Sequence, residues 1–413
     1  RRLGESEKMA EALLATADKA TMTSVQGELL MEAADLFRER LEQPARAEAV
    51  YRRALELDAD DPDLVIPAAS ALAGIYQEEG KHKKLAEVLA TQVRLVSDPG
   101  EVREIYARIA NIYEDLLDND QQAIEAWKAR LKEDPHDRPA LLALERLYER
   151  TEAWNDLVEV LRALEQSALE GDERKRCMVK AAQVLAGELG QTEEAINAWR
   201  AVLDDFGAEP DTLSALAELY EKAERWQDLA ETYESWLIDN EELHEKVRLF
   251  AALGDVRREH LDDPHGALSA YREVLTMEPG HAGARSSLAA LLEHEDADIK
   301  REAAEILSPL YEADGDAERL LKVLDIEIEA TFDPPSKLAS LKRALLTAED
   351  TVGSANRAFD YAARGVREGL GEPSLGEWID TVERLAGETG RFADLLELYE
   401  ADRKSTRLNS SHT

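Results

Sequence analysis

The sequence repeats itself with a period of 72 residues, and this period constrains the fold more than any other feature. Three similar segments carry an aromatic residue at the same place, and these residues lie 72 positions apart: Trp127, Trp199 and Tyr271. A second segment, interleaved with the first, places Trp154 and Trp226 at the same interval. A fixed period of this size is typical of arrays of small units that each pack only against their neighbours.

Between its breaks the chain has a helical apolar pattern. In residues 139–150, for example, one helix face would carry Leu141, Leu144, Leu147 and Tyr148. The breaks, such as "EDPHD" and "MEPGH", contain the residues typical of helix ends. No segment alternates with period two, as a half-buried strand would. Each 72-residue unit is therefore predicted to hold four helices, arranged as two hairpins.

The composition is strongly acidic. The formal net charge is −38, from 88 acidic and 50 basic residues. Such a charge repels nucleic acid and anionic membranes and favours basic partners. The alternative is that it only keeps a helical protein in solution. No apolar run reaches the roughly 20 residues needed to cross a bilayer. We therefore expect no nucleic-acid partner and no membrane span.

Small and aromatic residues recur at fixed places in the hairpins. One predicted first helix carries Tyr106, Ile109, Ala110 and Tyr113. The helix after it carries Ala123, Trp127 and Pro135. Small residues let neighbouring helices approach closely, and the aromatics fill the adjacent volume. This pattern resembles the tetratricopeptide repeat (TPR) family over residues 5–401. Some copies depart from it, since Glu145 stands where the family has a small residue.

The resemblance implies the fold and its division. We expect an all-α, right-handed superhelical α-solenoid of TPR-like helical hairpins, with about 20–22 helices and essentially no β-sheet. The first expected part, 1–60, consists of N-terminal TPR-like repeats whose beginning can be missing. A regular array with the 72-residue period follows over 61–293, and one inserted extra helix over 294–313. Divergent, truncated repeats are expected over 314–401. The inserted helix would share an apolar face made of Ile299, Ala303, Ile306, Leu307 and Leu310.

The C-terminal tail differs from the rest of the chain. It is rich in Ser and Thr and has no apolar period. Residues 402–412, "DRKSTRLNSSH", resemble the translation of a common short-read sequencing adapter. We therefore expect 402–413 to be a non-native, disordered tail, and its basic residues carry no functional argument.

No catalytic motif is present. The chain lacks a glycine-rich phosphate loop, a G-x-S-x-G segment and an H-E-x-x-H segment. The acidic groups "HEDAD" (294–298) and "DLLDND" (115–120) are interpreted as helix-end and loop residues, since the second lacks the Gly and Glu of a calcium loop. Cys177, the only cysteine, is expected to pack in the protein interior. We expect no enzyme activity, no cofactor and no metal.

The resemblance also implies where partners would bind. In the TPR family the first helices line a concave face that typically binds peptides or proteins. Projected onto this chain, the exposed positions of that face are Glu104, Asn111, Glu114, Arg146, Glu149, Gln183, Glu218, Glu221, Asp255 and Arg258. The set is mostly acidic, so we expect a basic or amphipathic protein segment to bind there in a salt-dependent way. The alternative is that these carboxylates only solvate the surface.

Three functions stay open. The favoured one is a non-catalytic protein–protein interaction scaffold. The alternatives are a regulatory or substrate-recruiting region of a larger enzyme, whose catalytic domain lies outside this sequence, and a structural component of envelope assembly. The chain does not begin with Met, so its true start can be missing, and a cytoplasmic location is preferred to export. The partner, the pathway and the oligomeric state cannot be read from the residues.

Overall fold

The computed structural model describes residues 2–400. Residue 1 and residues 401–413 lie outside that range, and so does the predicted non-native tail. The chain forms two compact units, which divide between Gly207 and Ala208. Each unit contains buried apolar side chains along its whole length. Every helix in the described range is too short or too polar to cross a membrane.

The described residues contain 22 helices and no strand, which confirms the predicted all-α repeat solenoid. The right-handed superhelix stays a prediction. The helices of the first unit are α1 (Arg2–Ala17), α2 (Thr23–Asp35), α3 (Pro44–Leu57), α4 (Pro62–Glu78), α5 (His82–Val93), α6 (Pro99–Asn111), α7 (Asp120–Glu133), α8 (Arg138–Arg150), α9 (Trp154–Ser167), α10 (Gly171–Gly187) and α11 (Thr192–Phe206).

The helices of the second unit are α12 (Pro210–Lys222), α13 (Trp226–Asp239), α14 (Leu243–Glu259), α15 (Pro264–Met277), α16 (Ala282–Leu291), α17 (Ala297–Asp314), α18 (Ala317–Ala330), α19 (Pro334–Leu346), α20 (Ala355–Glu368) and α21 (Leu375–Thr389). Residues 392–400 are also helical. Three π-helical turns lengthen α2, α6 and α19 at their C-terminal ends: η1 (Leu36–Arg40), η2 (Ile112–Leu116) and η3 (Thr347–Thr351).

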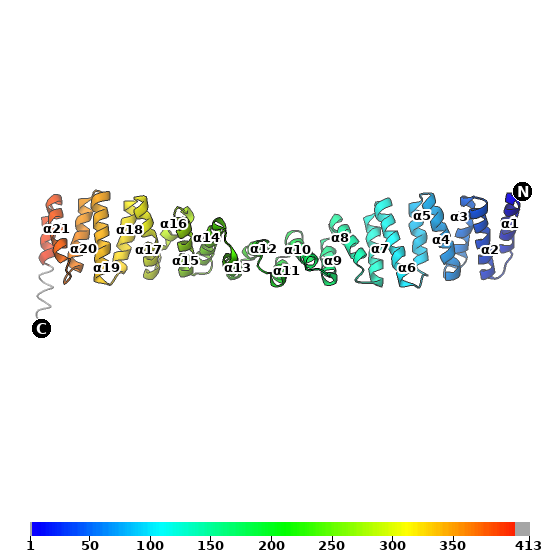
Figure 1. Ribbon diagram of the computed structural model, residues 1–413, viewed down its shortest axis with the longest axis horizontal. Coiled ribbons are helices and arrows are strands. Elements are labelled where there is room, and N and C mark those ends of the chain that lie inside the picture. The colour runs from blue at the N-terminus through cyan, green and yellow to red at the C-terminus, as the bar shows by residue number, and fades with distance from the viewer. Residues whose placement is uncertain (1, 401–413) are drawn as a thin grey trace, which may run out of the picture. The chain divides into compact units, whose positions relative to one another are not determined.

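Within each unit the helices lie side by side in chain order (Figure 1), and each packs against the next one in the chain. The contacts beyond the next helix are few. Pairs such as α6–α7, α8–α9 and α10–α11 form hairpins in the first unit, and α12–α13 and α14–α15 form hairpins in the second. This is the neighbour-only packing expected of a repeat array.

A residue with left-handed backbone geometry marks each hairpin turn. Two of the three glutamates of this kind, Glu152 and Glu224, have φ of 55° and lie 72 residues apart. The other hairpin turns hold Glu42, Gly80, Asp118, Gly190, Asp262, Gly315, Gly353 and Gly390. Because a side chain is strained in this conformation, its recurrence shows that the turn geometry itself is repeated.

Small residues allow close helix contacts, as predicted. Ala110 and Ala123, which face each other's helices in the α6–α7 hairpin, are fully buried. In the α14–α15 hairpin the matching residue is Gly254, and a Cβ atom added there would lie only 2.6 Å from Cε1 of Tyr271. Glycine at this place is therefore required by the aromatic side chain of the next helix.

The four repeat tryptophans divide into two groups. Trp127 and Trp199 are buried. Trp154 and Trp226 are half-buried, since each begins the second helix of its hairpin at the turn. The Trp226 ring stacks on His260, with ring centroids 3.7 Å apart.

The range of the predicted inserted helix, 294–313, is occupied by α17, and a shorter helix, α16, precedes it. Residues 297–314 form α17, in which Ile299, Ala303 and Leu307 are buried. This helix packs mainly against α18, with Gly315 at their turn, so it is the first helix of a regular hairpin. The short α16 (10 residues) lies before it. Of the two, α16 is the helix without a hairpin partner, and the proposed division into parts stays a prediction.

Candidate functional site

The ten predicted partner-binding residues all lie on first helices of hairpins. In the first unit, α6 and η2 carry Glu104, Asn111 and Glu114, α8 carries Arg146 and Glu149, and α10 carries Gln183. In the second unit, α12 carries Glu218 and Glu221, and α14 carries Asp255 and Arg258. Eight of these residues are exposed, and Glu114 and Arg258 are half-buried.

Glu114 joins two first helices. Its carboxylate lies 2.8 Å from Arg146 and 3.4 Å from Arg150, both on α8. The Glu114 side chain is only 6% exposed, although Arg146 is 63% exposed. Glu114 and Arg146 are therefore brought together as a contact between α6–η2 and α8, and the Glu114 carboxylate faces α8.

A similar contact joins α8 to α10. Glu149 lies 2.9 Å from Lys180, and the same ammonium lies 2.9 Å from Glu145. Arg176 lies 2.8 Å from Glu145, which is buried. Burial alone would raise the pKa of Glu145, but hydrogen bonds from Arg176 and Lys180 outweigh it and hold that pKa below its ordinary value. In the sequence, Glu145 is recognisable only as a departure from the repeat pattern.

Asp255 and Arg258 also act within the fold. Oδ1 of Asp255 accepts a hydrogen bond from the Tyr271 hydroxyl at 2.7 Å, and Nε of Arg258 donates to that hydroxyl at 3.2 Å. Burial, together with Asp255, raises the pKa of Tyr271 to about 12. This pair therefore holds the Tyr271 hydroxyl at the edge of the α14–α15 hairpin.

Three of the predicted residues form no contact of this kind: Glu104, Glu218 and Glu221. None of them forms an ion pair with a described residue, and all three are exposed. Glu104 and Asn111 line a cleft of about 500 Å³ along α6 and η2, where Leu116 is 51% exposed. Glu218 and Glu221 lie one helical turn apart on α12. These three carboxylates are exposed to solvent.

The acids that form ion pairs between first helices differ from the unpaired acids in having a basic residue at a fixed distance along the sequence. Three acids on first helices of the first unit have a paired base 31 or 32 residues later, namely Glu114–Arg146, Glu145–Arg176 and Glu149–Lys180. Glu104, Glu218 and Glu221 have no Lys or Arg at either spacing. An acid followed by a base at this interval is thus a sequence signal for contacts between successive first helices.

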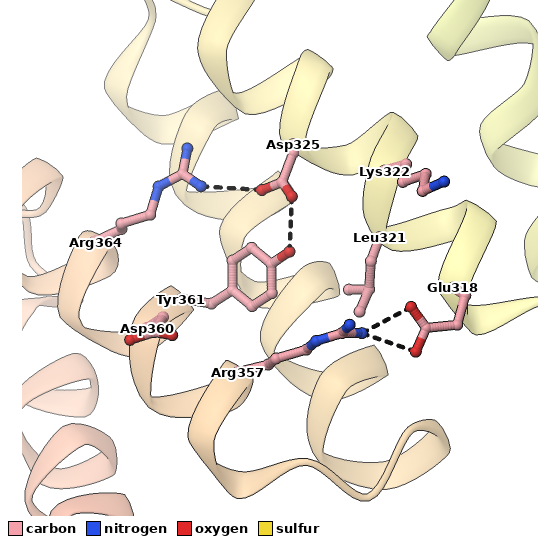
Figure 2. Close-up of a pocket in the computed structure, with 8 residues that line it drawn as sticks. All are labelled: Glu318, Leu321, Lys322, Asp325, Arg357, Asp360, Tyr361 and Arg364. Carbon is pink, nitrogen blue, oxygen red and sulfur yellow. Dashed lines mark hydrogen bonds and ion pairs between the residues drawn. The ribbon is translucent and has the colours of Figure 1, made fainter. Parts of the chain in front are cut away.

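A cleft of about 340 Å³ lies between α18 and α20 in the second unit (Figure 2). Arg357 lies 2.8 Å from Glu318, and Asp325 accepts from Tyr361 and Arg364 at 3.0 Å each. Because these charged groups are paired with one another across the cleft, we interpret it as a seam between α18 and α20.

The acidic groups noted in the sequence are helix-end residues. Asp296 accepts a hydrogen bond from the backbone N–H of Asp298 at 2.8 Å and caps α17, and His294 accepts from the backbone N–H of Asp296. Among the described residues, no group of three or more His, Cys, Asp or Glu side chains is arranged to hold a metal ion. Cys177 is fully buried, and burial raises the pKa of its thiol.

Comparison with known proteins identifies one repeat directly. Residues 212–245, which span most of α12, all of α13 and the start of α14, match the model of the tetratricopeptide repeat family. No curated protein matches the chain in sequence.

Many solved structures are similar to this one, among them the following three, all at low identity. The structure of Naa15/Naa10 bound to HypK-THB is 14% identical, with a TM-score of 0.33, over 98% of this chain and 64% of that one. This chain thus spans less than two thirds of that protein's length. A tetratricopeptide repeat protein from Parabacteroides merdae is 14% identical, with a TM-score of 0.27, over 64% and 97%. Pseudomonas aeruginosa pilF is 16% identical, with a TM-score of 0.25, over the same shares.

Proposed function

Because the chain is an array of divergent tetratricopeptide-like repeats, we propose that it is a non-catalytic scaffold that binds partner proteins or peptides along its first helices. Repeat arrays of this kind use extended surfaces, assembled from successive units, to bind other proteins. The partner we propose is a basic segment.

The observation that carries this proposal is the unpaired state of the exposed first-helix carboxylates. Glu218 and Glu221 lie on one exposed face of α12 without an ion pair to any described residue, and Glu104 does so on α6. Glu114, Glu145 and Glu149, which also lie on first helices, instead join neighbouring helices. In a chain of net charge −38, such carboxylates repel one another, and a basic partner relieves this repulsion.

The proposal is tested with a fluorescein-labelled peptide of alternating Lys and Ala residues. We expect the peptide to bind at low salt, and affinity to fall steeply as ionic strength increases. The double variant Glu218→Gln/Glu221→Gln should bind it about 5-fold more weakly, since exposed charge pairs contribute about 0.2–1 kcal/mol each.

A matched control removes the same charge elsewhere in the second unit. Glu273 and Glu278 are exposed and lie on, and at the end of, the second helix α15. The double variant Glu273→Gln/Glu278→Gln should bind nearly as the unmodified chain does. Absence of binding at low salt, or an equal loss in the two double variants, would refute binding along the first helices.

A further inference from the structure

A cavity of about 460 Å³ opens in the second unit between the start of α12, the end of α13 and the start of α14. Its apolar lining comes from Pro210, Leu213 and Trp236, and its rim carries Glu241, Glu242 and Glu245. The volume falls in the range of pockets that bind small molecules or single large side chains. It lies at the helix ends and contains none of the ten first-helix residues considered above.

The first unit has the same place in the repeat, but there an ion pair spans it. Arg138 and Glu173, which begin α8 and α10, are paired with each other. The residues 72 positions later are Pro210 and Glu245. Proline has no charged group to pair with Glu245, so the bridge of the first unit is lost in the second. Glu245 pairs with Arg248 of its own helix at 2.6 Å.

The floor of the cavity has changed in the same way. Leu164 of the first unit is 1% exposed, and the residue 72 positions later is Trp236, which is half-buried. The Arg248 guanidinium lies 5.4 Å from the centroid of the Trp236 ring. The cavity is therefore bordered by a large, flat aromatic ring, whereas the equivalent place in the first unit is filled by a buried leucine.

The surroundings of the cavity are both apolar and acidic. Ile238 is 77% exposed and lies two residues after Trp236 in the chain, and Leu243 is 60% exposed and directly follows Glu242. Glu241 and Glu242 are exposed and form no ion pair with a described residue. Exposed apolar side chains beside a pocket, rimmed by polar groups, are typical of protein interaction sites.

From these observations we propose that the α12–α13–α14 cavity binds one large apolar side chain of a partner protein segment, with basic residues on both sides of that side chain. The apolar side chain packs on Trp236 and Leu213. The flanking basic groups pair with Glu241 and Glu242. The site is separate from the ten first-helix residues considered above and adds a specific anchor to that surface.

The experiment compares two labelled peptides by fluorescence anisotropy. The first has one tryptophan with two arginines on each side, and the second has alanine in place of the tryptophan. We expect the tryptophan peptide to bind at least 10-fold more tightly. The double variant Glu241→Gln/Glu242→Gln should weaken the binding of both peptides by a similar factor, because it removes negative charge but does not change the shape of the cavity.

The substitution Pro210→Arg introduces the residue type of Arg138, the equivalent position of the first unit. The new arginine should close the cavity through an ion pair with Glu245. It should abolish the 10-fold preference for tryptophan, whereas Pro210→Ala should retain it. Trp236→Leu, which copies Leu164, gives a second variant that does not depend on position 210 and should also abolish the preference. Leu169→Ala, at the exposed loop of the first unit, is the surface control and should retain it.

Several results would overturn the proposal. The two peptides could bind the unmodified chain with equal affinity, which would show that charge attraction alone explains the binding. The preference could survive both Pro210→Arg and Trp236→Leu, or it could be lost in Pro210→Ala as well, which would assign the effect to the start of α12. A concentration-dependent dimer that Pro210→Arg abolishes would instead identify a second copy of the chain as the occupant.

Discussion

The carboxylate of Glu145 on α8 lies 2.9 Å from the ammonium of Lys180 on α10, so a buried charge joins two successive first helices. Arg176 completes the group from the same side. Contacts of this kind connect hairpins that the repeat pattern shows only as neighbours. They also decide which carboxylates stay available to a partner.

Removal of the Glu145 carboxylate should destabilise the first unit. Glu145→Ala leaves Arg176 and Lys180 without their shared partner and should cost about 1–2 kcal/mol, less than the loss from a fully buried pair because Arg176 is 46% exposed and Lys180 is 25% exposed. Hydrogen exchange should show the loss of protection concentrated in α8 and α10, because a repeat array transmits little beyond its neighbours. The control is Glu149→Ala, whose carboxylate is 54% exposed and should change stability by less than about 1 kcal/mol. Equal effects of the two substitutions would contradict this account.

Glu48 should make the first unit sensitive to acid. Burial alone would raise its pKa, but hydrogen bonds from Lys81, Lys84 and Tyr76 outweigh burial and lower the pKa of Glu48 to about 2. A carboxyl group whose pKa is lowered on folding stabilises the folded state above its unfolded pKa, and this contribution is lost as the pH falls toward the folded pKa.

The measurement compares the unmodified chain with Glu48→Gln between pH 6 and pH 2. At pH 6 the unmodified chain should be more stable by about 1 kcal/mol, a modest figure because Lys81 and Lys84 are partly exposed to solvent. The difference should shrink steadily below pH 4.5. A difference that stayed constant across this range would show that Glu48 does not titrate as described.

Gly254 should not tolerate a methyl group. An alanine Cβ there would lie 2.6 Å from the Tyr271 ring, so Gly254→Ala should destabilise the second unit by about 1–3 kcal/mol through overpacking. Gly387 on α21 has no atom within 4 Å of an added Cβ, and Gly387→Ala should stabilise by about 0.5–1 kcal/mol through helix propensity. Urea denaturation of both variants tests the contrast. Similar shifts for the two would show that the α14–α15 contact can relax.

The left-handed glutamates should be improved by glycine. Glu224 has φ of 55° at the α12–α13 turn, a conformation that costs a side chain about 1–2 kcal/mol relative to glycine. Glu224→Gly should therefore raise the thermal midpoint of the second unit, and Glu224→Gln, which removes only the charge, should not. Gly315 has φ of 68° at the α17–α18 turn, and Gly315→Ala should lower stability by a comparable amount. The idea fails if Glu224→Gln stabilises as much as Glu224→Gly.

Much of the hairpin architecture follows from local sequence. The apolar period shows which face of each helix is buried, because that face depends only on the helical turn. The breaks show where helices end. The pairing of Gly254 with Tyr271 could also be predicted, since it repeats the Ala110 and Trp127 places of the first unit.

The charge pairs and the cavity could not be predicted in the same way. Glu114 meets Arg146, whereas Glu221 forms no ion pair with a described residue; the 72-residue period does not encode this difference, and the spacing of acid and base is recognisable only once the helix contacts are known. The same holds for α16, where an added helix changes the contacts of α17 without changing its apolar pattern. Periodicity therefore determined the helices and their buried faces. The contacts between helices arise only when the hairpins pack together. These contacts decide that Glu114 and Glu149 form ion pairs between helices and that Glu218 and Glu221 stay exposed.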